Sequence, residues 1–366
     1  MSRLAAPDND IAIVSAGAVT CVGMTAASSC AAIRAGLDGF EETQFVDKLG
    51  APLLGAMVPD ETLGLGASHP GAILGGTGKL AAMFVRAATE CARGAGGVNP
   101  SRTALLLVGP DASRPDFMLA DLQDSFTACE RSLGRAFHPT SQITQIGNPG
   151  MAAALQYAQQ LLPSGEVDAV LVAGLDSLLN GSDIGHALTN NRLLSSENSD
   201  GLIPGEAAAC VLVKRVEDLE AFDAHGQMRD QVLQICGTAL TQEPESWFSG
   251  KANTGKGLAA AIKSALAASG IEAHQIHHRL SDVSGETFFM DEGTYAWGRV
   301  LRKLSPAGYT SPLIAASVGE TAAAAGPLMA ALALDMTRKR WAAGPYALIH
   351  LTSPASPRGA LVLRAV

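Results

Sequence analysis

A polar turn precedes an alanine-rich segment in residues 141–162, SQITQIGNPGMAAALQYAQQLL. Asn148 and Pro149 stand directly before the residues that predict a helix. A carboxamide cannot act as a nucleophile, but its oxygen can accept hydrogen bonds from the free N–H groups at a helix start, and proline suits the first helical position. The pair therefore predicts a capped helix without a nucleophile. The alternative is that Asn148 donates a hydrogen bond to a bound carbonyl group.

Two other stretches contain residue types that bind metals or phosphates. His274 and His278 stand four apart in HQIHH, a spacing that could bind a metal on a helix. The stretch falls between a predicted helix and a predicted strand, which favours surface histidines. Residues 73–79, ILGGTGK, lack the first glycine and the Lys-Ser/Thr pair of a phosphate loop, so we expect a turn before a helix starting near Lys79. We predict no metal site and no cofactor.

The composition describes a compact, heavily buried protein. Of 366 residues, 47% are hydrophobic and 17% charged, and the net charge of −9 comes without any cluster of Lys and Arg, so nucleic-acid binding is disfavoured. Apolar runs such as residues 169–175 are too short to span a membrane, and the polar start MSRLAAPDND has no secretory signal pattern. We expect a cytoplasmic protein.

The six cysteines show no C-x-x-C spacing and stand mostly in apolar patterns. Reduced, buried thiols are the interpretation that this pattern favours. They are Cys21, Cys30, Cys91, Cys129, Cys210 and Cys236.

Short apolar runs punctuated by glycine alternate with alanine-rich helical segments, which predicts an α/β protein with parallel strands covered by helices. Strands are expected in residues 11–23, 103–109, 167–179 and 207–215, and a helix in 24–36 that Gly36 can close. The pattern then begins again, with strands at 230–240 and near 312–317, helices at 255–270 and 320–340, and final strands at 346–352 and 359–365. We therefore predict a duplicated architecture with halves at residues 9–220 and 230–366, connected by the charged residues 214–230.

Several segments resemble, in order, the β-ketoacyl synthase branch of the thiolase superfamily. Residues 13–40 are similar to the opening strand, glycine turn and first helix of that family. Residues 167–215, VDAVLVAGLDS followed by DG, PGE and AAACVLVKR, resemble its most specific stretch. Residues 280–301 and 314–326 resemble the two loops that carry its histidines. The resemblance implies a five-layer α-β-α-β-α fold with two mixed sheets, a two-fold dimer, and a site where the halves meet.

The same resemblance implies that the chemistry of the family is missing. Its condensing members hold the acyl chain on a thiolate at a buried helix N-terminus, and two histidines stabilise the negative charge that develops. The matching positions here are Asn148 for the cysteine and Ser284 and Glu320 for the histidines. Ala315 matches a lysine of the family, and the glycine-rich gate matches nothing better than SPASPRGA, residues 353–360.

We predict that the inherited pocket is lined by polar residues, and the alternative is a rebuilt active site. Ser284 and Glu320 could form the catalytic pair of a hydrolase, although no histidine is available to take the proton of the serine. For Glu206 a structural hydrogen-bonding role is favoured, and His186 could lie at a dimer contact. The predicted lining residues are Asn148, Glu206, Ser284, Glu286, Glu320 and Thr321.

The sequence therefore predicts a ketosynthase-like protein that acts through binding. The resemblance implies a homodimer, or a heterodimer with an active ketosynthase comparable to a chain-length-factor subunit, with an acyl carrier protein as a possible further partner. An accessory role in bacterial effector delivery is a variant of this hypothesis. The alternative is an acyl-thioester enzyme, namely an acyltransferase, decarboxylase or hydrolase, that uses Asn148, Ser284 and Glu320. No nucleic acid or membrane is expected as a partner.

Overall fold

The structure is a computed structural model, and it describes residues 10–64, 77–112, 114–115, 119–219, 230–304 and 310–366. The strands are β1 (Ile11–Thr20), β2 (Phe40–Val46), β3 (Pro52–Ala56), β4 (Thr103–Gly109), β5 (Gln142–Gln145), β6 (Ala169–Ser177), β7 (Glu206–Arg215), β8 (Leu233–Gln242), β9 (His278–Ser281), β10 (Tyr346–Leu351) and β11 (Pro357–Ala365). The helices are α1 (Ala26–Ala35), α2 (Thr77–Gly94), α3 (Leu119–Leu133), α4 (Gly150–Leu161), α5 (Gly181–Thr189), α6 (Lys256–Ser269), α7 (Thr287–Val300), α8 (Ala315–Val318) and α9 (Ala325–Arg338).

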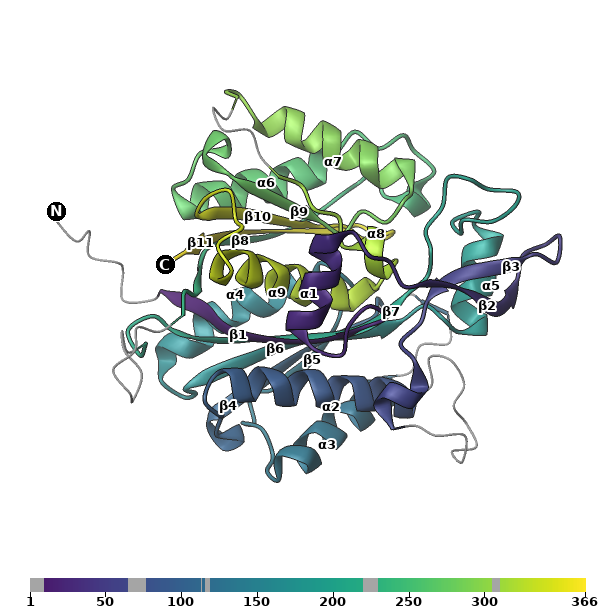
Figure 1. The fold of residues 1–366 in the computed structure, drawn as a ribbon. Helices are drawn as coiled ribbons and strands as arrows, with labels where there is room; N and C mark the ends of the chain where they lie inside the picture. The colour runs from purple at the N-terminus through teal and green to yellow at the C-terminus, as the bar shows by residue number, and fades with distance from the viewer. Residues whose placement is uncertain (1–9, 65–76, 113, 116–118, 220–229, 305–309) are drawn as a thin grey trace.

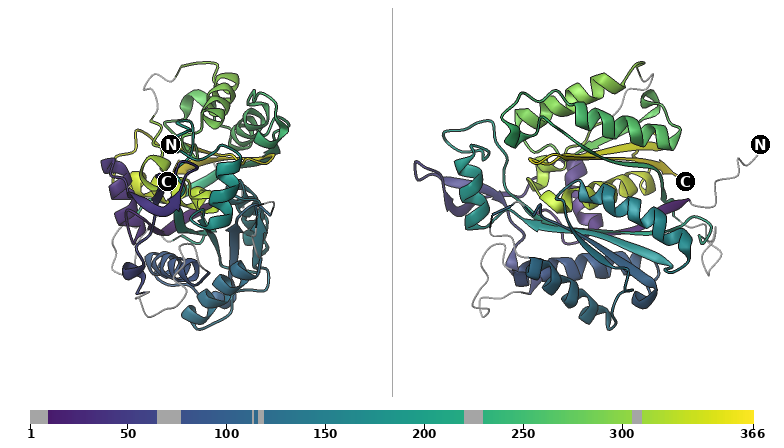
Figure 2. Two further views of the ribbon diagram at one scale, coloured as in Figure 1. Left: turned by 90° about the vertical axis from the view of Figure 1, so that its right-hand side faces the viewer. Right: turned by 180° about the vertical axis from the view of Figure 1, so that it is seen from behind.

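Helices and strands are stacked in five layers (Figure 1). Helices α2 and α3 cover one sheet region, α6 and α7 cover the other, and α1, α4 and α9 lie between the two. The view from behind in Figure 2 shows the same stacking. The predicted α/β class and its five-layer arrangement are confirmed.

Hydrogen bonds connect nine strands in the order β5-β4-β6-β7-β1-β8-β11-β10-β9, and β2 and β3 form a separate hairpin. Both sheet regions are mixed: β4 is parallel to β5 and β6, and β9 is parallel to β10, whereas the other pairs are antiparallel. The regions meet where β1 pairs with β8 through only two residue pairs, Ala12 with Gln234 and Ile13 with Leu233. The two predicted mixed sheets are therefore two layers of one continuous hydrogen-bonded sheet.

The apolar runs of the sequence become buried elements because both faces are covered. Every residue of β4 and β6 is buried, as expected for parallel strands between two helical layers. Twelve of the fourteen residues of α9 are buried, which places this helix in the middle layer. Helix α1 ends at Gly36, whose left-handed backbone (φ +68°) closes the helix as predicted.

The prediction of a strand near residues 312–317 is wrong. Residues Ala315–Val318 form the short helix α8, and Leu313 contributes only an isolated bridge to Ser281. The buried residues here are Ile314, Ser317 and Val318, at three- and four-residue spacing, so one turn of helix buries this side of the run and a strand would not.

Some predictions fall partly outside the described residues. These are the connection between the halves at 220–229, the N-terminal segment 1–9, and residues 73–76 of ILGGTGK. Helix α2 begins at Thr77, close to the predicted position. The six cysteines are all described and unpaired; four are buried and two partly buried. Among the described residues, no helix is both long enough and apolar enough to span a bilayer.

Strand β6 packs closely on the backbone of the middle layer at Gly174. A Cβ atom at Gly174 would lie 2.1 Å from the carbonyl oxygen of Ala323, and backbone on both sides prevents relief. We expect Gly174→Ala to lower the free energy of unfolding by about 3 kcal/mol in urea titrations. The control is Gly298→Ala on α7, where a Cβ meets open space, so stability should rise by up to about 1 kcal/mol. Equal stability of both variants would contradict the packing described here.

Candidate functional site

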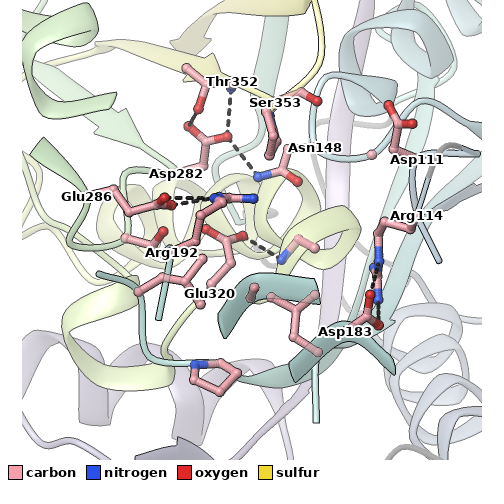
Figure 3. Close-up of a pocket in the computed structure, with 18 of the residues that line it drawn as sticks. Asp111, Arg114, Asn148, Asp183, Arg192, Asp282, Glu286, Glu320, Thr352 and Ser353 are labelled. Atoms are coloured by element: carbon pink, nitrogen blue, oxygen red, sulfur yellow. Dashed lines mark hydrogen bonds and ion pairs between the residues drawn. The ribbon is translucent and has the colours of Figure 1, made fainter. Parts of the chain in front are cut away.

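A cavity of about 110 Å³ lies where elements of the first and second halves of the chain meet (Figure 3). Its polar wall comes largely from residues at or just beyond the carboxyl ends of strands: Asp176 in β6, Asp282 after β9 and Thr352 after β10. Asn148, just before α4, completes this wall. Binding sites in α/β proteins form at this edge of a sheet, because the loops there are free to carry polar groups.

Asp282 connects three segments that are distant in sequence. Its Oδ2 accepts hydrogen bonds from Asn148 Nδ2 at 2.9 Å and from the Thr352 backbone N–H at 2.7 Å, and its Oδ1 accepts one from Thr352 Oγ1 at 3.1 Å. The prediction that the Asn148 side chain caps the helix is therefore wrong. Helix α4 begins after Pro149 without a side-chain cap, because the amide of Asn148 donates to a buried carboxylate instead.

Two carboxyl groups in this wall have raised pKa values. Burial, strengthened by nearby Glu320, raises the pKa of Asp282 to about 7, and burial likewise raises the pKa of Glu320. The hydroxyl of Ser284 donates a hydrogen bond to Glu320, and the Ala322 N–H donates another at 2.8 Å. Near neutral pH this wall therefore holds one carboxyl group, that of Asp282, which is close to its pKa.

An arginine from the chain after α5 reaches the same cavity. Arg192 forms a bidentate pair with Glu286, with Nε 2.8 Å from Oε1 and Nη2 2.7 Å from Oε2. Its guanidinium carbon lies 5.5 Å from the ring centre of Trp247 and 5.7 Å from that of Phe289. Both charged side chains are largely buried, so they are little screened by water.

A second arginine holds the other end of the cavity. Arg114 pairs with Asp176 at 2.6 Å and with Asp183 of α5, and it donates to the carbonyl oxygen of Ser177 at 3.1 Å. Figure 3 shows this pair on the opposite side of the cavity from Glu286. Asp176 and Asp183 thus share one guanidinium, which comes from the chain itself.

Residues 353–360, which follow β10, are fixed by a buried ion pair. Arg358 on β11 and Glu292 on α7 are both fully buried, and their Nε and Oε1 atoms lie 2.5 Å apart. Arg358 Nη1 also donates to the carbonyl oxygens of Ser353 and Ala355 at 2.8 and 2.7 Å. This part of the cavity wall is therefore held rigidly.

The structure brings together four of the six residues predicted to line the pocket: Asn148, Ser284, Glu286 and Glu320. The prediction is corrected for Glu206 and Thr321. Glu206 is fully buried away from the cavity, where it pairs with Lys79 at 2.6 Å and accepts from Ser177 Oγ at 3.1 Å, which is the structural role expected of it. Thr321 is buried beside the lining residue Ala322 but does not line the cavity, and Ala315 lies in α8 outside it.

The lining residues offer no thiol. None of the six cysteines, all of which are described, lines the cavity, and burial raises the pKa of the Cys30 and Cys91 thiols to about 12. Among the described residues that line the cavity, His186 of α5 is the one histidine, and its ring centre lies 6.4 Å from that of Phe248. A cysteine paired with a histidine is therefore missing from this wall.

The histidine stretch HQIHH forms no metal site. His278 begins β9 and is buried, with Nδ1 2.8 Å from Thr310 Oγ1 and Nε2 3.1 Å from the carbonyl oxygen of Gly344, so the expectation of surface histidines is wrong for this residue. His274 is partly exposed and lies beside Glu272. Among the described residues, no group of three or more His, Cys, Asp or Glu side chains could hold a metal ion.

Sequence reasoning missed Asp282, Arg192, Arg114 and Thr352. Asp282 stands two residues before Ser284 in a segment that the resemblance already marked, and its place after a buried strand was the available signal. Arg192 and Arg114 come from irregular segments without periodicity, so no pattern in the sequence pointed to them.

The raised pKa of Asp282 makes the stability of the folded protein depend on pH. Its carboxyl titrates near 3.8 in the unfolded chain and near 7 in the folded chain, so the folded protein holds a proton that the unfolded chain lacks between these values. The protonated Asp282 carboxyl therefore adds to the free energy of unfolding at low pH, and this contribution is lost as the pH rises through about 7. Since a tenfold change in proton affinity is worth about 1.4 kcal/mol, the loss is at most about 4 kcal/mol.

We therefore expect Asp282→Asn, which can still accept from Asn148 and Thr352, to flatten the fall in unfolding free energy between pH 5 and pH 8. Urea titrations at both pH values measure this change. Asp282→Ala is the matched control, because it leaves buried donors without an acceptor and should be less stable at both pH values. Parallel pH profiles of the wild type and Asp282→Asn would refute the assignment.

Comparisons with known proteins agree with this architecture. A family model described as the N-terminal domain of beta-ketoacyl synthase matches residues 150–219, which run from α4 to beyond β7. No curated protein matches the sequence significantly.

Solved structures match over nearly the whole chain. The ishigamide ketosynthase/chain length factor has 18% identity and a TM-score of 0.72, covering 98% of this chain and 99% of that one. A type II polyketide synthase acyl-carrier protein complex with its ketosynthase, AntDE:AntF, has 14% identity and a TM-score of 0.78, covering 98% and 100%. The ketosynthase ApeO in complex with its chain length factor ApeC, from Xenorhabdus doucetiae, has 16% identity and a TM-score of 0.70, covering 98% of both. The chain therefore has the fold of the solved ketosynthases, and its residues 150–219 are similar to the N-terminal domain of beta-ketoacyl synthase.

Proposed function

We propose that this chain is a non-condensing ketosynthase-like subunit that acts by binding a partner. The observation that carries the proposal is Asn148 at the start of α4, with its amide engaged by Asp282. A condensing enzyme needs a thiolate at such a helix start to accept the acyl chain. An amide donor bound to a carboxylate cannot form a thioester.

The surrounding groups support the same conclusion. Condensation generates negative charge that hydrogen-bond donors or cations must stabilise. The wall here contributes Asp282 and Glu320, and their carboxylates would repel that charge when ionised. The proposed losses at the positions of Asn148, Ser284, Glu320 and Ala315 are therefore consistent with one another.

The structural likeness supports a ketosynthase-like partner. Two of the similar structures pair a ketosynthase with a chain length factor, and a third pairs a ketosynthase with a carrier protein. We propose a heterodimer with an active ketosynthase, in the cytoplasm and with an acyl carrier protein as a possible further partner. A homodimer, or a role in an effector-delivery machine, is the variant that the partner experiment below distinguishes.

One contact supports a second candidate function, an acyl-thioester enzyme with a rebuilt site. The Ser284 hydroxyl donates to Glu320, and burial raises the pKa of this carboxyl, which makes it a better proton acceptor than an exposed glutamate. In this alternative Ser284 is the nucleophile and Glu320 its base.

Intact-mass spectrometry after incubation with acetyl-, malonyl- and octanoyl-pantetheine separates the two functions. We expect no added mass on the wild type and no release of pantetheine above the rate without protein. Ser284→Ala is the matched variant: an acyl adduct or turnover that this substitution abolishes would establish the enzyme and end the proposal.

Native mass spectrometry tests the partner. The tagged chain is co-expressed with each ketosynthase encoded near its gene, and we expect a one-to-one complex whose condensing activity falls at least tenfold without this chain. Asn148→Cys is informative as a control, since a subunit that acts by binding should support the partner equally well with either residue. A chain that forms only homodimers with every ketosynthase tested would contradict the heterodimer.

A further inference from the structure

The side chain of Arg192 lies in the middle of the cavity wall rather than at its edge. Figure 3 shows its guanidinium between Glu286 on one side and Asn148 and Glu320 on the others. All four residues line the same cavity. The space in front of Asn148, which an acyl group would have to enter to reach the start of α4, is thus shared with a side chain of the protein itself.

The backbone that carries Arg192 is tightly fixed. Asn191 adopts a left-handed conformation (φ 55°) that asparagine tolerates, and this turns the chain sharply after α5. The Arg192 N–H donates to the carbonyl oxygen of Ala187 at 2.8 Å, and its own carbonyl accepts from the Leu202 N–H at 2.8 Å. The side chain of Asn198 donates to the carbonyl oxygens of Asn191 and Leu193, both at 3.0 Å.

The same loop is bonded to the segment that carries Glu286. Asp200 Oδ1 accepts from the Thr287 N–H at 2.7 Å, at the start of α7. Gly285 packs so closely on Gly201 that a Cβ atom would lie 2.7 Å from its carbonyl oxygen. Arg192 and its carboxylate partner are therefore held at a fixed separation by two loops in direct contact, and their pairing does not depend on a flexible surface side chain.

The guanidinium of Arg192 is held by a carboxylate and by two aromatic rings. Nε and Nη2 are satisfied by the carboxylate of Glu286, and the rings of Trp247 and Phe289 lie beside the cation. The exposed fraction is 12% for the side chain of Arg192 and 2% for that of Glu286, so displacing the arginine would leave a buried carboxylate without its partner.

We propose that Arg192 is an internal plug, paired with Glu286, that keeps acyl chains out of the cavity. This inference rests on the proposed non-condensing function and adds the residue that closes the pocket. The paired side chains take up part of the space beside Asn148, so the chain can contribute a binding surface without competing for acyl groups.

Isothermal titration with octanoyl-pantetheine tests the plug. The opening variant is Arg192→Ala combined with Glu286→Gln, which removes the side chain without leaving a buried charge. The matched control is Arg192→Met combined with Glu286→Gln, which refills the space with an apolar side chain. We expect the Ala variant to bind at least tenfold more tightly than the wild type and the Met control, whose binding should be too weak to measure. Circular dichroism confirms that each variant is folded.

A folded opening variant that binds no better than the wild type would overturn the plug, and so would tight binding by the wild type itself. Should the double variant fail to fold, Glu286→Gln alone replaces it, because losing the carboxylate frees the guanidinium; this variant is expected to bind more tightly than the wild type, and unchanged binding overturns the plug. These results are separate from those on the proposed function, which fails if the wild type gains a covalent acyl group.

Discussion

The hydrogen bonds to Asp282 are the interaction on which the candidate site depends. A buried carboxyl group must find donors, and this one finds them on Asn148 before α4 and on Thr352 after β10. Three segments from both halves of the chain are thereby held around one cavity. The same constraint engages the amide of Asn148, so the residue that the sequence suggested as a helix cap serves the contact between the halves instead.

Several charged groups around the cavity are paired within the protein. Arg114 pairs with Asp176 and Asp183, Arg192 pairs with Glu286, and farther back Arg358 pairs with Glu292. Pairs with these levels of burial cost much to break and add little net stability once made, and in this chain they fix loop positions.

Fold and chemistry are separable in this protein. The five layers, the mixed sheet and the site at the strand ends are shared with ketosynthases at identities below 20%, and a likeness of that degree specifies a scaffold, not a reaction. Function has to be argued from Asn148, Ser284 and Glu320 and from what surrounds them. Among the described residues that line the cavity there is no cysteine.

The sequence by itself determined the class, most elements and the location of the site. Buried strands such as β4 and β6 and the glycine end of α1 follow from local periodicity and backbone preference, which act over a few residues. Only the tertiary structure decided what the polar residues do. Residues Ala315–Val318 formed a helical turn, Glu206 paired with Lys79, and Asn148 bonded to Asp282, because each outcome depends on a partner more than 30 residues away or on burial against another layer. Arg192 shows the limit most clearly: nothing near it in sequence indicates a cavity, and its role follows from loops that meet only in the folded chain.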